Sequence, residues 1–243
     1  MRWLEHFISE FKFVFLESER YQLILSGLLV TLEITLLAVL IGIALGIVVA
    51  SIRSTYDKNI EEMRKRKDIG YYFLCIGNVL CKIYLTVIRG TPTVVQLLIA
   101  YFIIFSTSNN DVQIAVFAFG INSGAYVAEI IRAGIMSVPN GQFEAGRSLG
   151  FNYTQTMIYV IIPQMIKNVL PALCNEFIVL IKETSIAGYI GITDLTKAGD
   201  LIRGRTFSAF LPLFGVAAIY LLLVLILTYL VGKLERRLRV NER

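Results

Sequence analysis

The sequence predicts an all-α integral membrane protein with about five transmembrane helices. Hydrophobic residues make up 56% of its 243 residues, charged residues make up only 17%, and the mean hydropathy is +0.68. A soluble domain is about half apolar and about a quarter charged, so the excess apolar surface of this chain requires lipid. Because each crossing takes about 20 residues, the length accommodates roughly five crossings with short connections.

The first segment, residues 1–20, has the pattern of an amphipathic helix. Its apolar side chains recur every three or four positions, as at Phe7, Phe11 and Phe15. That spacing predicts a helix lying in the membrane interface. The apolar run that follows, 22–52, is much longer than the core of a signal peptide, and we expect it to remain as the first crossing.

A second apolar stretch, 71–105, is too long for one helix across about 30 Å of lipid. The sequence Arg89-Gly90-Thr91-Pro92 interrupts it, and a glycine with a proline two residues later breaks a helix. We therefore expect 71–88 to form an interfacial or partly inserted helix and the second crossing to run from about 92 to 105.

Three further runs complete the five crossings. They cover about 113–135, 164–186 and 210–231. We expect a single transmembrane domain over 21–238 and a short tail over 239–243.

The distribution of basic residues predicts the orientation. Lys and Arg are concentrated in 53–68 and in the tail after the last crossing, whereas the short loop 106–111 has none. Basic loops remain in the cytoplasm, which places the N-terminus outside, and the C-terminus and the loop 136–162 inside, of a bacterial or archaeal cytoplasmic membrane. The segment 187–209, with Lys197, Arg203 and Arg205, then falls outside against this rule.

Several function classes do not fit the sequence. The net charge of +5 is explained by topology and lipid contact, so we expect no nucleic-acid partner. The lone His6 and three scattered cysteines predict neither a metal site nor a disulfide framework. No GxxxxGK[ST] motif is present to hold phosphates, so energy for any transport must come from a partner or an ion gradient.

The loop 136–163 is unusually long for a connection between crossings and carries its own helical signals. Asn140 is a suitable N-cap, and Glu144 is expected in the first turn of a helix, near the positive end of its dipole. Ala145 and Gly146 would leave a surface poor in side chains, onto which another protein could pack closely.

The second half of this loop predicts another helix. Gly150 suits the left-handed position after a helix end, and Asn152 with Gln155 resembles a capping box. We expect the second helix to stop near Pro163, which gives a helix–turn–helix over about 139–163.

This loop resembles the EAA loop of ABC importer permeases. The family pattern is Glu-Ala-Ala, three residues, Gly, nine residues, and Ile-x-Leu-Pro, and the matching positions here are Glu144-Ala145-Gly146, Gly150 and Val160-Ile161-Ile162-Pro163. Gly146 replaces the usual alanine, and Val160 and Ile162 are conservative aliphatic changes. Gly146 is expected to weaken the helix by roughly 1 kcal/mol relative to alanine.

Three other stretches are similar to the polar amino-acid branch of that family, which includes histidine, glutamine and arginine permeases. They are Arg89-Gly90-Thr91-Pro92 with Gln96, Asn122 to Ile130, and Ile181 to Ser185. The resemblance covers about 20–238.

The resemblance implies a transport subunit that is not itself an enzyme. Two such permeases, identical copies or paralogues, pair across the membrane, and each EAA loop docks on a cytoplasmic ABC ATPase subunit. An extracytoplasmic binding protein delivers a polar amino acid. This chain would bind no cofactor, and ATP and Mg would belong to the ATPase. Nucleotide-dependent contacts would then bias a bundle with two states.

Polar residues within the crossings are candidates for the substrate pathway. Asn122, Ser123 and Glu129 lie on the third crossing, and Asn175 and Glu176 lie on the fourth. Such residues usually face protein or water, so they either line a substrate cavity or form hydrogen bonds between helices. Arg89 lies near an expected membrane boundary and is interpreted either as a gate or, by default, as a topology anchor.

Two other function classes remain as alternatives. A gradient-driven carrier or channel is disfavoured by the small number of crossings, the lack of an inverted repeat and the structured loop. An intramembrane enzyme is disfavoured because no Ser/His/Asp, HExxH or paired-Asp arrangement is present. The residues leave open which amino acid is carried and whether the permease pair is homodimeric.

Overall fold

The computed structural model describes residues 2–66 and 69–240, and almost all of them belong to helices. The elements are α1 (Arg2–Phe11), η1 (Lys12–Leu16), η2 (Glu17–Glu19), α2 (Tyr21–Arg66), α3 (Ile69–Gly90), α4 (Thr93–Ile99), η3 (Ala100–Ile104), α5 (Asp111–Ser137), α6 (Asn140–Ser148), α7 (Tyr153–Thr156), η4 (Met157–Ile161), α8 (Ile162–Glu183), η5 (Thr184–Ile190), α9 (Leu195–Thr206) and α10 (Phe210–Val240).

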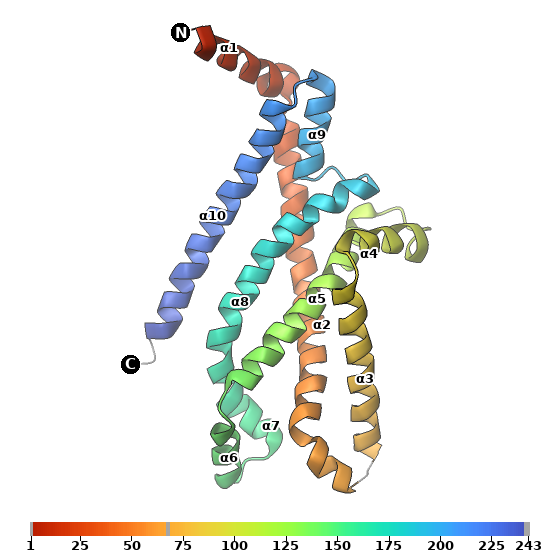
Figure 1. Ribbon diagram of the computed structural model, residues 1–243, viewed down its shortest axis with the longest axis vertical. Coiled ribbons are helices and arrows are strands. Elements are labelled where there is room, and N and C mark those ends of the chain that lie inside the picture. The colour runs from red at the N-terminus through yellow and green to blue at the C-terminus, as the bar shows by residue number, and fades with distance from the viewer. Residues whose placement is uncertain (1, 67–68, 241–243) are drawn as a thin grey trace.

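Helix α2 is the central element. It has 46 residues and runs along almost the whole length of the molecule, with α3 beside one half and α9 beside the other (Figure 1). Helix α5 crosses its middle, and α8 and α10 lie on the opposite side from α3. The α6–α7 hairpin lies at one end of the molecule, and α1 and α9 lie at the other.

Small residues allow α2 and α5 to approach closely. A Cβ atom on Gly46 would overlap Cγ1 of Val127, and one on Gly42 would lie 2.9 Å from Oγ of Ser123. On α5, a Cβ on Gly124 would lie 2.9 Å from the hydroxyl of Tyr84 on α3. Association of helices in lipid depends on such close packing of small residues, so these glycines hold the centre of the bundle together.

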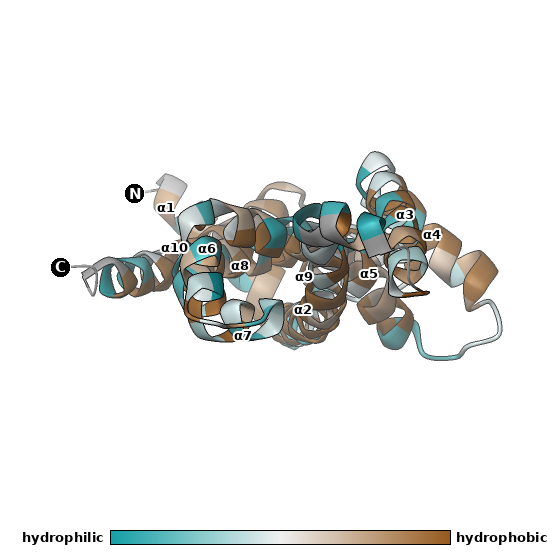
Figure 2. Cartoon of the chain, turned by 90° about the horizontal axis from the view of Figure 1, so that it is seen from below, coloured by the Kyte–Doolittle hydropathy of each residue, from teal (hydrophilic) through white to brown (hydrophobic). Residues whose placement is uncertain are grey.

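Five described helices are long and apolar enough to cross a membrane, which confirms the predicted fold class. They cover Tyr21–Lys58, Ile69–Gly90, Asp111–Ser137, Tyr153–Ile190 and Phe210–Leu238. Figure 2 shows hydrophobic colour along these helices and hydrophilic patches on the α6–α7 hairpin.

The assignment of the second crossing was wrong. At 1.5 Å per residue, α3 extends about 33 Å, whereas Thr93–Ile104 extends only about 18 Å and falls among the shorter apolar helices. The helix break occurs at the expected Gly90-Thr91-Pro92 sequence, but the membrane-length segment precedes the break instead of following it. The Gly-Thr-Pro sequence located the break but could not indicate which side of it spans the membrane.

The predicted terminal segments lie partly outside the described residues. Within 1–20, α1 is a helix that projects sideways from the end of α2 (Figure 1). Ser18 and Glu19 have φ values of 54° and 53°, and this left-handed turn separates the N-terminal segment from the start of α2 at Tyr21. Of the predicted tail 239–243, residues 241–243 are outside the described part of the chain.

Candidate functional site

The α6–α7 hairpin has well-formed helix ends. Gly150 has φ +84°, and its N–H donates to the carbonyl of Arg147 at 2.9 Å, while Phe151 N–H donates to the carbonyl of Gly146 at 3.0 Å. This pair of bonds is a Schellman motif. Asn152 and Gln155 form the predicted capping box, with both side-chain-to-backbone bonds at 2.9 Å. The turn geometry is therefore fixed by local sequence.

The small residues of the hairpin serve two different surfaces. Gly146 is buried against α7, where a Cβ atom would lie 2.6 Å from Cγ2 and 2.8 Å from Oγ1 of Thr156. Ala145 and Glu144 are exposed. The expectation that Gly146 belongs to an outward surface was wrong, because the glycine lets α6 pack against α7.

Three local expectations for this loop also require correction. Pro139 occupies the N-cap position of α6, so Asn140 is the first helical residue and not the cap. The side chain of Asn140 makes no capping bond and instead accepts a hydrogen bond from Lys58. Glu144 is the fifth residue of α6 and lies beyond its first turn. The second helix does not stop near Pro163: the helical run passes from η4 into α8, and Pro163 lies in the first turn of α8, where a residue without an N–H is tolerated.

The end of α2 contacts the hairpin directly. Lys58 Nζ donates to Oδ1 of Asn140 at 2.6 Å and lies 4.4 Å from the ring centre of Phe143. A cavity of about 250 Å³ lies at this junction, and Glu144 and Arg147 contribute to its lining. The hairpin is thus attached to the central helix as well as to α8.

The first group of predicted pathway residues forms contacts between helices. Asn122 is 1% exposed, and its Nδ2 donates to Oε1 of Gln96 at 2.9 Å. Ser123 is fully buried and donates to Oε1 of Glu176 on α8 at 3.1 Å. Asn175 is exposed on α8. The structure brings Ser123 and Glu176 together, while Asn122 faces the α3–α4 break.

Glu129 belongs to a different environment, an ion-pair network between α2 and α5. Its Oε2 accepts bonds from Nε and Nη2 of Arg132 at 3.3 and 3.1 Å, and its Oε1 lies 3.7 Å from Nη1 of Arg53. Nη1 of Arg132 also lies 3.6 Å from Oδ2 of Asp57. The negative charge of Glu129 is therefore shared between two guanidinium groups.

An open cavity of about 610 Å³ lies beside this network, between α2, α3 and α5. Its lining includes Glu129, Tyr126 and three basic side chains, Arg53, Lys82 and Arg89. The guanidinium carbon of Arg89 lies 5.6 Å from the ring centre of Tyr126. A charged side chain in the bilayer centre costs about 2.5–3.5 kcal/mol on insertion scales, so the open side of this cavity requires water or protein.

Sequence reasoning missed these basic residues. Lys82 was not considered, and Arg89 was interpreted by default as a boundary anchor, with a gate as the alternative. A usable signal was present, since Lys82 and Arg89 are seven residues apart and therefore share one face of α3. It was overlooked because 71–88 was not assigned as a crossing.

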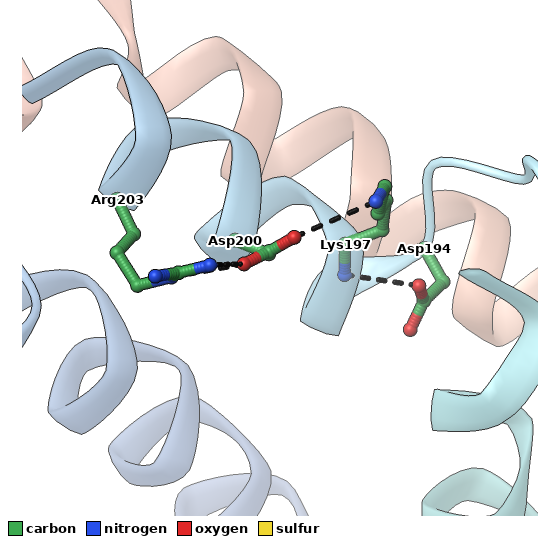
Figure 3. A network of polar contacts seen from close by, with 4 residues as sticks. All are labelled: Asp194, Lys197, Asp200 and Arg203. Carbon is green, nitrogen blue, oxygen red and sulfur yellow. Dashed lines mark hydrogen bonds and ion pairs between the residues drawn. The ribbon is translucent and has the colours of Figure 1, made fainter. Parts of the chain in front are cut away.

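The opposite end of the molecule carries a polar cluster on α9 (Figure 3). Asp194 is fully buried and caps α9, accepting from the N–H groups of Thr196 and Lys197 at 3.0 Å. Burial raises the pKa of Asp194, and these bonds oppose the rise. Arg203 lies 2.6 Å from Oδ1 of Asp200 and, through this hydrogen bond, lowers the pKa of Asp200.

Within residues 2–66 and 69–240, the three cysteines are free. No group of three or more His, Cys, Asp or Glu side chains in this part of the chain lies close enough to hold a metal ion.

Comparison with known proteins identifies similar membrane proteins over most of the chain. The family described as "Binding-protein-dependent transport system inner membrane component" matches residues 72–240. A putative glutamine transport system permease of Rickettsia typhi is 34% identical over 221 residues, covering 90% of this chain and 94% of the relative. The arginine transport system permease of Bacillus subtilis is 37% identical, covering 90% of this chain and 94% of that protein.

Solved structures agree with this similarity. A chain from the crystal structure of an amino acid ABC transporter with histidines has a TM-score of 0.78 and 43% identity, covering 92% of this chain and 98% of that chain. A chain of the inward-facing MetNI methionine ABC transporter has a TM-score of 0.74 at 18% identity, covering 90% and 97% respectively, and supports the fold alone.

Proposed function

The chain belongs to the family of binding-protein-dependent transport system inner membrane components, and we propose that it is the translocation subunit of an ATP-driven importer for polar amino acids. The amino acid is delivered by an extracytoplasmic binding protein. ATP and Mg are bound and hydrolysed by separate cytoplasmic ABC ATPase subunits, and a second permease copy or paralogue completes the pathway.

The α6–α7 hairpin is the observation that carries the proposal. It projects at one end of the bundle (Figure 1), its ends are fixed by a Schellman motif and a capping box, and it holds Glu144 and Ala145 on its exposed side. A compact, exposed hairpin attached to α2 and α8 is suited to passing a push or pull from a docked partner to two long helices. Family relatives named as glutamine and arginine permeases support an amino-acid cargo.

The proposed role of each hairpin residue follows its position. Glu144 contacts the ATPase, and Ala145 allows close approach beside it. Gly146, Gly150 and Pro163 shape the coupling segment instead of touching the partner, because Gly146 is buried, Gly150 forms the turn, and Pro163 lies where η4 joins α8.

The orientation proposed for the chain follows from the hairpin. If the ATPase is cytoplasmic, the α6–α7 end lies inside and the α1 and α9 end lies outside. The N-terminus is then outside and the C-terminal end of α10 points inward, in agreement with the basic residues of 53–68.

A charge reversal on the hairpin tests the docking step. The permease carrying Glu144→Lys would be purified together with its ATPase. A permease carrying Glu61→Lys, which reverses an exposed charge near the C-terminal end of α2, would serve as the control. Because a hot-spot residue of an interface costs about 2 kcal/mol or more when it is altered, we expect Glu144→Lys to weaken ATPase binding about thirtyfold or more. The control should bind normally, and both variants should insert into the membrane.

Undiminished co-purification of the ATPase with Glu144→Lys would refute this docking surface. The transport class is tested separately in liposomes, where the chain alone should move no amino acid and the full complex should couple uptake to ATP hydrolysis. Flux through the chain alone would favour a channel or gradient-driven carrier.

A further inference from the structure

The charge of the cavity between α2, α3 and α5 bears on which amino acids the chain transports. Among the described residues that line it, Arg53, Lys82 and Arg89 are basic, and Glu129 is the only acidic group. These four groups give a formal charge of +2. The adjacent Arg132 and Asp57 form an ion pair and leave this balance unchanged.

The single acid of the cavity is not free to balance a cationic cargo. Glu129 already contacts two guanidinium groups, those of Arg53 and Arg132. By contrast, neither Lys82 nor Arg89 takes part in the ion pairs found among the described residues. Nε of Arg53 is buried and has no hydrogen-bond partner in the described part of the chain.

The position of these cations makes a purely structural role expensive. Lys82 and Arg89 are exposed on one face of α3, a helix of membrane-spanning length, and they are about 10 Å apart along its axis. Hydrocarbon does not solvate such groups, so intramembrane charges face water or protein and commonly mark solute pathways.

We infer that this cavity selects amino acids by charge, holding the substrate carboxylate against Lys82 and Arg89, accepting neutral polar and acidic amino acids and disfavouring basic ones. The inference rests on the proposed import function and specifies its substrate class. Guanidinium and ammonium groups form strong charge-assisted hydrogen bonds with carboxylates. The ring of Tyr126, which lies beside Arg89, also lines the cavity and offers a π face to the substrate ammonium.

The sign of the field argues against basic cargo. An arginine or lysine substrate carries a second positive charge into a cavity whose own charge is already +2, and like charges at close range in a poorly solvated site repel strongly. Glutamine adds no charge, and glutamate adds a negative charge that the cavity attracts.

Equilibrium binding to the assembled permease–ATPase complex in lipid nanodiscs, without the binding protein, tests the inference directly. Radiolabelled glutamine, glutamate and arginine would be compared at equal concentration. We expect glutamine and glutamate to bind at least about tenfold more tightly than arginine. Arginine binding as tightly as the other two, or no amino acid binding at all, would overturn the inference.

Charge-removing variants then assign the effect to the cavity. Lys82→Gln and Arg89→Gln should each weaken glutamate binding about tenfold and glutamine binding less, whereas Lys233→Gln, an exposed site near the end of α10, should change neither. Equal losses for both ligands, or the same loss in the control, would contradict charge selection.

The outcome is separable from that of the proposed function. ATP-dependent uptake by the complete importer would be measured in parallel with the same three amino acids. Uptake of arginine in preference to glutamine would leave the importer function intact and overturn only the charge selection. Absence of any ATP-dependent uptake would instead count against the proposed function. If a variant fails to assemble, the comparison of ligands on the unaltered complex still decides.

Discussion

At the scale of single residues, the contact between Gly146 and Thr156 sets the shape of the α6–α7 hairpin. The side chain of Thr156 is 2% exposed and occupies the space that a methyl group on Gly146 would need. Thr156 Oγ1 also donates to the carbonyl of Asn152 at 3.0 Å, which fixes its rotamer and prevents an easy retreat. The glycine is therefore matched to its neighbour.

This contact predicts a compensating pair of substitutions. Gly146→Ala should raise helix propensity but overpack the hairpin, with a net loss of roughly 1 kcal/mol or more. Adding Thr156→Ala should restore most of the loss, because it removes both atoms that a Cβ would meet at less than 3.0 Å. Thermal unfolding and ATPase affinity of the two single variants and the double variant give the coupling energy. Additive effects would show that the two residues do not interact.

At the scale of elements, Gln96 stabilises the break between α3 and α4. Its Nε2 donates to the carbonyls of Ile88 and Thr91 at 2.7 and 3.1 Å, and its Oε1 accepts from Asn122 on α5. Freed backbone carbonyls inside a membrane need internal partners. One side chain thus satisfies the end of α3 and attaches the break, with Arg89 just before it, to the third crossing.

Replacing this amide should loosen the break. Gln96→Leu has nearly the same size but leaves the buried Nδ2 of Asn122 without its acceptor, and we expect a loss of about 1–3 kcal/mol in unfolding free energy. Gln113→Leu, an exposed amide on α5, serves as the control. Thermal unfolding in detergent measures the stability of both variants. The double variant Gln96→Leu, Asn122→Leu should lose less unfolding free energy than the two single variants lose together. If Gln96→Leu left the unfolding free energy unchanged, water would replace these hydrogen bonds.

At the scale of the whole molecule, the two ends carry different structural elements. One end carries the α6–α7 hairpin attached to α2, and the other carries α9 with its Asp200–Arg203 pair (Figures 1 and 3). Helix α2 connects both ends because it is 46 residues long. Movement of the hairpin is therefore expected to reach the ion-pair network of Arg53 and Glu129 through one continuous helix.

The orientation of these ends is testable by labelling. In a variant with Cys75, Cys81 and Cys174 replaced by alanine, single cysteines would be placed at Arg205 on α9 and at Gly141 on α6, both exposed positions. A membrane-impermeant maleimide should label Arg205→Cys in intact cells and Gly141→Cys only after the membrane is opened. The reverse pattern would invert the proposed topology.

Patterns that depend on neighbouring residues could be predicted from the sequence. The apolar runs predicted a five-crossing helical membrane protein, and the capping box at Asn152 and the left-handed Gly150 were predicted because helix ends are set within a few residues. The break at Gly90-Thr91-Pro92 was predicted for the same reason.

Packing between distant segments could not be predicted in this way. Whether Gly146 faces α7 or a partner, whether Asn122 binds Gln96 or lines a pathway, and which acid meets Arg53 all depend on how helices far apart in sequence lie against each other. The sequence by itself determined the membrane class, the hairpin and its turn, since hydrophobicity, periodicity and capping act locally. Only the tertiary structure decided that three basic side chains and one shared acid face a common cavity, because their charge balance arises from the contacts among α2, α3 and α5.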